Sequence, residues 1–213
     1  MSIPIRPSAS ASEAYLLLAD ISGYTSFLAG VGEAHGVDFS GGIPDGYALL
    51  GAVLDAVVEG VEPDFEIAKL EGDAVFGVAA AAALDGRGES VLTRLRAVHR
   101  AFHARRLEAR EAGKHECTAC PLVSNLDLKM VLHRGHAVRQ GVGSRTELLG
   151  PDVNVAHRLL KNTIQARIGY RPYLFLTDAA AAGLALANVG MEHREEYPDV
   201  GSISGRIVEL SAS

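Results

Sequence analysis

The sequence predicts an α+β fold in which helices pack on a sheet. Segments of strand length and of helix length follow each other in a mixed order, which favours this architecture over a barrel or a helical bundle. Hydrophobic residues make up 48% of the chain and charged residues 22%, as in ordinary globular proteins. The 213 residues suit one elaborated domain, which we place at 14–213 after a flexible tail at 1–13.

The net charge and the lengths of the apolar runs argue against nucleic-acid partners, membrane insertion and secretion. Lys and Arg number 20 and Asp and Glu 26, and the net charge of −6 provides no general attraction for nucleic acid or an anionic membrane. The longest apolar run, residues 74–84, is shorter than the ~20 residues that span a bilayer. The first residues lack a secretory apolar segment and the chain has 2 cysteines, so we expect a cytoplasmic protein without nucleic-acid or membrane partners.

In the first part of the chain we expect a buried strand, a loop and a helix. Residues 15–19 are uniformly apolar, which is typical of a strand buried on both faces. The Gly-rich residues 30–45 indicate a loop. Apolar residues then recur at helical spacing, which predicts a helix over 46–60.

The rest of the chain predicts a hairpin and further helices and strands. Glu71-Gly72 lies between two apolar runs and predicts a hairpin. An apolar stripe among many arginines predicts an amphipathic helix over 90–111, whose arginines we interpret as a solvated face. The other expected elements are strands at 65–69, 74–78, 126–132, 137–142, 173–176 and 206–210, and helices at 153–163 and from 178 onward.

Asp20 directly follows the first apolar run, in the segment Asp20-Ile21-Ser22-Gly23-Tyr24-Thr25. A carboxylate at the end of a buried strand can hold a metal, and the following Gly23 lets backbone amides around Tyr24 and Thr25 approach a phosphate. The alternative is that Asp20 caps the next helix. A phosphatase is rejected, because Ser22 stands where its second Asp is required.

Asp73 supplies a second carboxylate, just past the turn of the predicted hairpin. Mg²⁺ prefers hard oxygen ligands in octahedral geometry, and two carboxylates from adjacent strands would meet that need. The alternative is an Asp that only stabilises an exposed turn.

Asn154 and Arg158 are four residues apart in a predicted helix and therefore leave the same face. An amide and a guanidinium aimed at one point suit an anion whose charge grows during a reaction. The alternative is a surface helix with scattered polar groups.

Four short motifs occur in order along the chain. They are Ala19-Asp20-Ile21-x-Gly23-Tyr24-Thr25, Lys69-x-x-Gly72-Asp73, His133-x-Gly135 and Gly150-x-x-Val153-Asn154-x-Ala156-x-Arg158. Together they resemble the catalytic-domain signature of class III nucleotidyl cyclases. The resemblance implies a ferredoxin-like cyclase sandwich with a mixed, mainly antiparallel sheet and helices packed on it. More loosely, the whole chain, with Cys117-x-x-Cys120, is similar to an uncharacterised bacterial subgroup of cyclase-like proteins.

The resemblance implies a two-metal site. Asp20 and Asp73 would bind two Mg²⁺ or Mn²⁺ ions, with the Ile21 carbonyl as an additional ligand. Gly23, Tyr24 and Thr25 would contact the substrate phosphates.

The remaining site residues have roles that the resemblance also implies. Lys69 and Glu147 fall where the family reads the base, and Asn154 and Arg158 where it orients the ribose and stabilises the transition state. In the family, these four come from one chain of a head-to-tail homodimer and the metal ligands from the other. Arg145 is a candidate by location for the cation that holds the terminal phosphates.

The implied reaction converts a nucleoside triphosphate to a 3′,5′-cyclic nucleotide and pyrophosphate. Lys69 can donate to a ring nitrogen and Glu147 can accept from an exocyclic amine, which favours ATP over GTP. Cytosine presents the same pattern, so CTP stays open. The alternative function is a catalytically inactive, cyclase-like module that binds a nucleotide or regulates a partner; a diguanylate cyclase is a weaker enzyme alternative, since only Gly72-Asp73 matches its motif.

Two further groups can be read as a zinc site. One is Cys117-x-x-Cys120 with His115, and the other is His99 with His103, one helical turn apart. A single CxxC without a second pair is a poor metal signal, so we favour two reduced cysteines in a loop.

Overall fold

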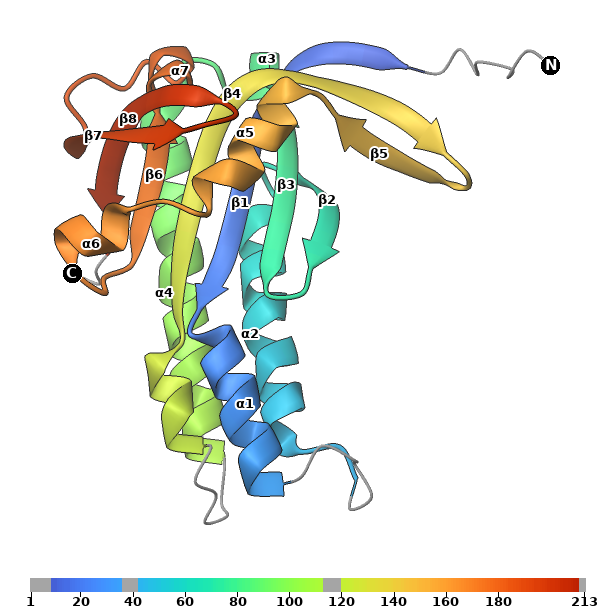
Figure 1. Cartoon of the computed structure of the whole chain (residues 1–213), viewed down its shortest axis with the longest axis vertical. Coiled ribbons are helices and arrows are strands. Elements are labelled where there is room, and N and C mark those ends of the chain that lie inside the picture. Colours follow the sequence, from blue (N-terminus) through green and yellow to red (C-terminus); the bar gives the residue numbers. More distant parts are fainter. Residues whose placement is uncertain (1–8, 36–41, 113–119, 211–213) are drawn as a thin grey trace.

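The computed structural model describes residues 9–35, 42–112 and 120–210 (Figure 1). Its centre is a mixed, mainly antiparallel sheet, and helices pack on both faces, so the predicted α+β fold class is confirmed. Residues 1–8 of the expected tail lie outside the described residues.

Within the described residues, the sheet has eight strands in the order β2-β3-β1-β4-β6-β8-β7, with β5 paired to β4. Neighbouring strands are antiparallel except β4 and β6, which are parallel. The strands are β1 (Ser10–Ser22), β2 (Glu66–Glu71), β3 (Ala74–Ala80), β4 (Asp127–Val142), β5 (Arg145–Leu149), β6 (Tyr173–Thr177), β7 (Met191–Tyr197) and β8 (Gly201–Glu209).

Strand β1 lies in the middle of the sheet and is covered on both sides, as the apolar run over 15–19 predicts. Because side chains alternate along a strand, Tyr15, Leu17 and Ala19 enter one core, while Leu16 and Leu18 enter the other. Burying each leucine contributes about 1.5–3 kcal/mol.

Helices α1 (Tyr24–His35), α2 (Asp45–Val61) and α4 (Gly88–Ala112) pack on the first core, while α5 (Pro151–Leu159) packs on the second. Figure 1 shows α5 lying across the upper part of its face, and the lower ends of β1, β3 and β4 without a helix in front of them. The predicted helices over 46–60 and 90–111 are confirmed as α2 and α4. The shorter helices are α3 (Ala81–Leu84), η1 (Cys120–Asn125), α6 (Ile164–Ile168) and α7 (Asp178–Gly183).

Two expected boundaries near the N-terminus are wrong. Strand β1 begins at Ser10, so residues 10–13 of the expected tail pair with β4 instead. The expected loop over 30–45 is helical up to His35, in α1. Gly30 is a packing glycine, because a Cβ there would lie 2.3 Å from the side chain of Leu122.

The expected break between strands at 126–132 and 137–142 is absent. All of β1 pairs with residues 127–139 of β4, so residues 133–136 are part of one continuous strand. The expected helix over 153–163 is shorter than predicted: α5 ends at Leu159, and a separate helix, α6, begins at Ile164. Asn162 separates them: its amide donates to the Leu159 carbonyl at 2.7 Å, and its side-chain oxygen accepts from the Ile164 N–H at 3.1 Å. The polar strands β5 and β7 were not predicted, since they lack an apolar run.

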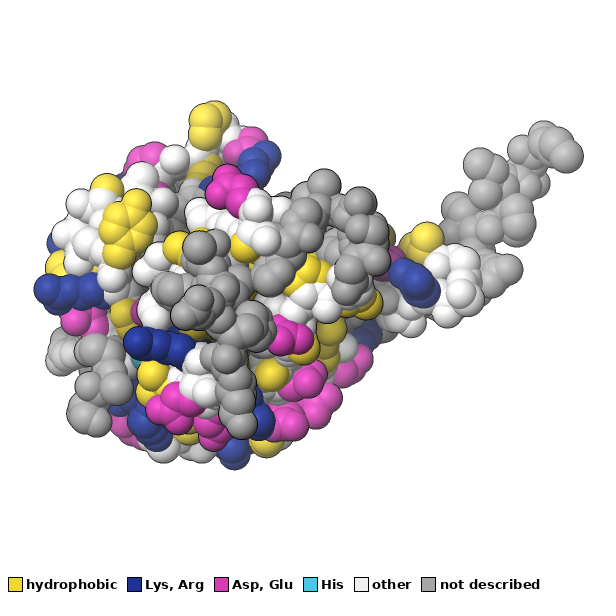
Figure 2. Space-filling view, turned by 90° about the horizontal axis from the view of Figure 1, so that it is seen from below, with side chains coloured by type: hydrophobic (Ala, Val, Ile, Leu, Met, Phe, Trp, Pro, Cys, Tyr) yellow, Lys and Arg dark blue, Asp and Glu magenta, His cyan; other side chains and the backbone are white. Residues whose placement is uncertain are grey.

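Viewed from below, acidic side chains gather along one edge of the molecule among scattered basic and hydrophobic ones (Figure 2). Among the described residues, no helix combines the length and the hydropathy that crossing a bilayer requires.

Candidate functional site

Asp20 and Asp73 lie beside each other at one end of the sheet. Asp20 faces Ala74 across the β1–β3 pair, so the residue before Ala74 is its neighbour. The Ile21 N–H donates to the Asp73 carbonyl at 3.1 Å, which fixes the β2–β3 turn against the end of β1. Gly72 in this turn has a φ of 67°, a left-handed conformation that favours glycine. The chain therefore brings together two carboxylates that are far apart in the sequence.

The charges of Asp20 and Lys129 both affect the protonation of Asp73. Burial raises the pKa of the Asp73 carboxyl, and the negative charge of Asp20 raises it further, while the Lys129 ammonium acts in the opposite direction. Lys129 Nζ lies 2.9 Å from Asp20 Oδ2, and both side chains are largely buried. Positive charge near the two carboxylates would therefore stabilise their ionised forms. The Lys129 ammonium provides one such charge.

Lys129 belongs to this candidate site, although it was not predicted from the sequence. It faces Asp20 in the β1–β4 register. The available signal was a single ammonium within the apolar run Leu128-Lys129-Met130-Val131-Leu132. A lysine in a buried strand requires a partner, because an unpaired charge is expensive to bury. Arg145, the cation chosen by location, is instead exposed at the start of β5.

A cleft of about 570 Å³ opens next to this pair, and its walls include Gly23, Asn125 and Lys129. Gly23 has a φ of 85°, and a Cβ there would lie 2.7 Å from the Asn125 carbonyl oxygen, so the position requires glycine. The predicted phosphate-contacting residues differ in placement. Gly23 lines the cleft, Tyr24 packs against the apolar core, and Thr25 is exposed on the first turn of α1.

Three of the other predicted residues meet in a second pocket, of about 210 Å³. Lys69 comes from β2, Glu147 from β5 and Asn154 from α5. Lys69 Nζ lies 3.3 Å from Glu71 Oε1, and Phe76 forms part of the apolar wall. The pocket thus combines an ammonium, a carboxylate and an amide with an apolar surface.

Arg158 does not line this pocket. Its guanidinium lies 2.5 Å from the Asp199 carboxylate, and both side chains are about half exposed. Asn154 and Arg158 do both project from the exposed side of α5, as their spacing predicts. The Arg158–Asp199 pair is a surface ion pair, which contributes little stability and can exchange partners.

The motif His133-x-Gly135 docks α5 on the sheet. A Cβ at Gly135 would lie 2.4 Å from Asp152 Cγ, so glycine leaves room for the first turn of α5. Asp152 Oδ2 accepts from the His136 N–H at 2.6 Å, and Asp152 Oδ1 lies 3.5 Å from His133 Nε2. The motif therefore positions the helix that carries Asn154.

We expect His133 to make the stability depend on pH. Burial lowers the pKa of its imidazole, an effect that Asp152 partly opposes. Below the unfolded pKa of ~6.5, the unfolded chain takes up a proton that the folded chain resists, so stability present above that pKa is lost as the pH falls. Urea unfolding of His133→Gln should show a smaller loss of stability between about pH 7 and 5 than wild type.

Thr93→Ala, which alters an exposed residue of α4 without a titratable side chain, is the control for this experiment. It should retain the wild-type dependence on pH. An equal loss of stability in wild type and His133→Gln would contradict the assignment.

Both groups of residues lie on the face of the sheet that carries α5. Asp20 continues the alternation of Leu16 and Leu18, which face α5. Lys69 lies opposite Phe76 in the β2–β3 register, and Phe76 belongs to the same core. Neither cleft contains Asp20 or Asp73 in its wall, so the carboxylate pair and the Lys69 pocket are separate sites in one chain.

Comparison with known proteins gives the family. A family model described as "Protein of unknown function (DUF2652)" matches residues 50–168, more than half of the chain. The "Uncharacterized protein Rv2561/Rv2562" of Mycobacterium tuberculosis is 31% identical over 169 residues, which cover 78% of this chain and 73% of that protein. The chain belongs to the DUF2652 family. The matched range contains Lys69, Asp73 and Asn154, whereas Asp20 precedes it.

Solved nucleotidyl cyclases share the fold of this DUF2652 protein. The adenylyl cyclase CyaB from P. aeruginosa has a TM-score of 0.65 at 14% identity, and 97% of each chain is covered. The guanylyl cyclase Cya2 has a TM-score of 0.65 at 13% identity, over 94% of this chain and 92% of that one. A bacterial light-regulated adenylyl cyclase has a TM-score of 0.61 at 18% identity, over 97% of this chain. The DUF2652 chain spans 54% of that cyclase's length.

Proposed function

We propose that this protein is a class III nucleotidyl cyclase that forms a 3′,5′-cyclic nucleotide and pyrophosphate, with ATP as the favoured substrate. The observation that carries the proposal is the convergence of Asp20 and Asp73, with Lys129, at the end of β1. The cyclase fold supports it, although that fold occurs in adenylyl and guanylyl cyclases alike.

The donor set at the carboxylate pair fits Mg²⁺ or Mn²⁺. Asp20 and Asp73 offer carboxylate oxygens and Ile21 a carbonyl oxygen, which are the hard ligands that these ions prefer. The raised pKa of Asp73 agrees with this fit, because burial and the adjacent carboxylate disfavour its negative charge. Two bound ions would lower the pKa of the substrate 3′-hydroxyl and neutralise the triphosphate.

The chain's own residues bind and orient the nucleotide in this proposal. Lys129 contacts Asp20 and also lines the cleft that contains Gly23. Its ammonium can therefore turn from Asp20 to a phosphate oxygen of a nucleotide bound in that cleft. The 210 Å³ pocket receives the base: Lys69 donates to a ring nitrogen, and Glu147 accepts from the exocyclic amine of adenine. Guanine would present a carbonyl oxygen to Glu147, and two acceptors repel each other.

We propose that two chains assemble head to tail and share each active site. The Lys69 pocket and the carboxylate pair lie on one face of the sheet but do not share a cavity. Rotation of a second chain onto this face would set the carboxylates of one chain against the pocket of the other. Asn154 would then orient the ribose, and Arg158 would leave Asp199 to stabilise negative charge at the α-phosphate.

The test of this function is an assay with each of the four nucleoside triphosphates and Mn²⁺. We expect cyclic nucleotide and pyrophosphate in equal amounts, fastest with ATP. Nucleotide binding without product would favour the catalytically inactive module. If the protein neither binds a nucleotide nor forms product, both the cyclase and the nucleotide-binding module are overturned.

Arg158→Ala is expected to lower kcat by about 10²-fold with a much smaller change in nucleotide affinity, because its guanidinium acts on charge that develops in the transition state. Steady-state kinetics and equilibrium nucleotide binding measure the two quantities separately. Asp199→Asn is the matched control, since it breaks the same surface ion pair but leaves the cation free. Equal effects of the two substitutions would assign Arg158 to the ion pair alone.

A further inference from the structure

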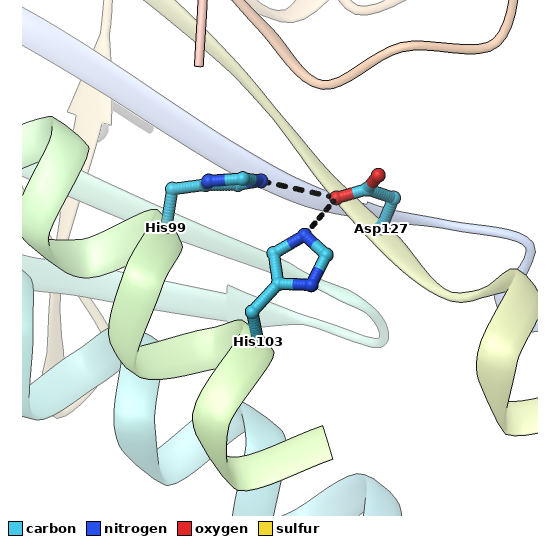
Figure 3. A group of neighbouring side chains, drawn as sticks. All are labelled: His99, His103 and Asp127. Carbon is cyan, nitrogen blue, oxygen red and sulfur yellow. Dashed lines mark hydrogen bonds and ion pairs between the residues drawn. The ribbon is translucent and has the colours of Figure 1, made fainter. Parts of the chain in front are cut away.

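A second group of potential metal ligands lies between α4 and β4. His99 and His103 are one turn apart on α4, and both rings point toward Asp127, the first residue of β4 (Figure 3). Sequence spacing predicts that the two histidines share a helix face, but only the fold brings Asp127 to them. Of the sequence-based zinc candidates, His115 and Cys117 lie outside the described residues, and Cys120 opens η1.

The spacing of the three ligand atoms leaves room for a bound transition-metal ion. His99 Nε2 and His103 Nε2 each lie 3.2 Å from the same oxygen, Asp127 Oδ1. The three ligand atoms all lie within 4.8 Å of one another. Zn²⁺ binds nitrogen and oxygen at roughly 2.0–2.2 Å in a tetrahedron, which separates neighbouring ligand atoms by roughly 3.3–3.6 Å. An ion therefore fits between these atoms after small side-chain movements.

Burial fixes the ring of His99 beside Asp127. The residue is 1% exposed, and its Nε2 atom lies 3.2 Å from Asp127 Oδ1, while its Nδ1 atom has no hydrogen-bond partner among the described residues. Nε2 is therefore the ring atom that this histidine offers to an ion. A side chain that is already fixed loses little freedom when it binds.

Asp127 is positioned to act as a ligand. Its Oδ1 atom accepts from the Leu128 N–H at 2.8 Å, which holds the carboxylate in place, and the same atom lies 3.2 Å from Nε2 of each histidine.

We propose that His99, His103 and Asp127 bind one divalent transition-metal ion of the Zn²⁺ class. Two imidazole nitrogens select such ions over Mg²⁺, which prefers oxygen ligands, so this site is chemically distinct from the Asp20–Asp73 pair. Three protein ligands leave a position for water. Asp127 also lines the 570 Å³ cleft with Gly23 and Lys129, so the ion would join α4 to the wall of that cleft.

Binding of the ion would break a hydrogen bond between Arg106 and His103, which lowers the affinity. Arg106 Nη2 lies 2.8 Å from His103 Nδ1, which accepts this hydrogen bond only when it carries no proton. Ligation at Nε2 places the imidazole proton on Nδ1, so Arg106 must turn away from the ring. Its Nη1 also donates to the Ser124 carbonyl at 3.1 Å, which keeps the guanidinium anchored during that movement.

The experiment is a titration of the metal-free full chain with Zn²⁺ against a chromophoric chelator. The buffer contains excess Mg²⁺, which occupies oxygen-ligand sites such as the Asp20–Asp73 pair but competes poorly for imidazole nitrogen. Under this condition we expect one tightly bound Zn²⁺ ion per chain, and His103→Gln and Asp127→Asn should each weaken binding by at least about tenfold. Three controls should bind as wild type does: His136→Gln, an exposed histidine elsewhere; Asp73→Asn, in the proposed catalytic pair; and the double variant Cys117→Ser/Cys120→Ser. The Asp73→Asn control separates this site from the proposed cyclase function.

Co²⁺ provides a second measurement. Wild type should give visible absorption bands of a low-coordinate Co²⁺ site without a thiolate charge-transfer band, and His103→Gln should lose them. His103 is partly exposed, so we expect this variant to fold, which circular dichroism checks. Absence of stoichiometric Zn²⁺ binding, equal binding by folded His103→Gln, or loss of binding in the cysteine variant would each overturn the proposal.

Discussion

Asp73→Asn is expected to reduce cyclic nucleotide formation by at least about 100-fold, because it removes one of the two charged ligands of the proposed metal site. The substitution keeps the shape of the side chain and the backbone carbonyl that accepts from the Ile21 N–H, so the turn should persist. The measurement is the rate of product formation over a range of Mn²⁺ concentrations.

The stability of Asp73→Asn should not fall with its activity. Burial and the charge of Asp20 raise the pKa of Asp73, so its ionised form destabilises the metal-free folded chain above the usual Asp pKa. Replacing the carboxylate with an amide should therefore leave the free energy of unfolding at neutral pH unchanged or higher. Asp55→Asn, which alters an exposed carboxylate on α2, is the control and should affect neither quantity. Full activity of Asp73→Asn would remove this residue from the mechanism.

A mixture of two inactive variants, Asp73→Asn and Arg158→Ala, is expected to recover activity. In a head-to-tail dimer each site takes its carboxylates from one chain and its guanidinium from the other, so a mixed dimer holds one site without either substitution. Random exchange of subunits would restore about a quarter of the wild-type sites, since half of the dimers are mixed and each has one intact site.

The matched control is a mixture of Asp73→Asn with Asp20→Asn. Both substitutions affect the same half of the site, so mixed dimers contain no intact site and should remain inactive. Recovery in this control, or no recovery in the first mixture when sedimentation shows mixed dimers, would contradict the shared site.

The elements that the sequence predicts best are those with strong local patterns. The run over 15–19 is apolar at every position and becomes the centre of β1, while the helical spacing over 46–60 becomes α2. Strands that lack a local pattern, and that form because a neighbouring strand pairs with them, were missed. Strand β7 is polar and pairs with β8, and β4 continues through residues 133–136 because β1 extends far enough to pair with them.

In the candidate site, too, local motifs could be predicted and contacts between separate elements could not. The motifs around Asp20 and Asp73 could be read from residue types and spacing, and the hairpin at Glu71-Gly72 explains why the second one lies at a turn. Lys129 could not be linked to Asp20 from the sequence, because their contact depends on the register of β1 against β4. The Arg158–Asp199 pair likewise depends on where the segment after β7 folds back.

By itself the sequence determined the α+β class, the buried central strand and the acidic, amide and guanidinium groups available for chemistry. These are local properties, set by side-chain type and by the periods of 2 and 3.6 residues. Only the tertiary structure decided that Lys129 neutralises Asp20, that Lys69, Glu147 and Asn154 share one pocket, and that Asp127 meets two histidines of α4. The reason is physical: each of these groupings joins residues from separate elements, and strand register and helix packing, which no local pattern specifies, set their positions.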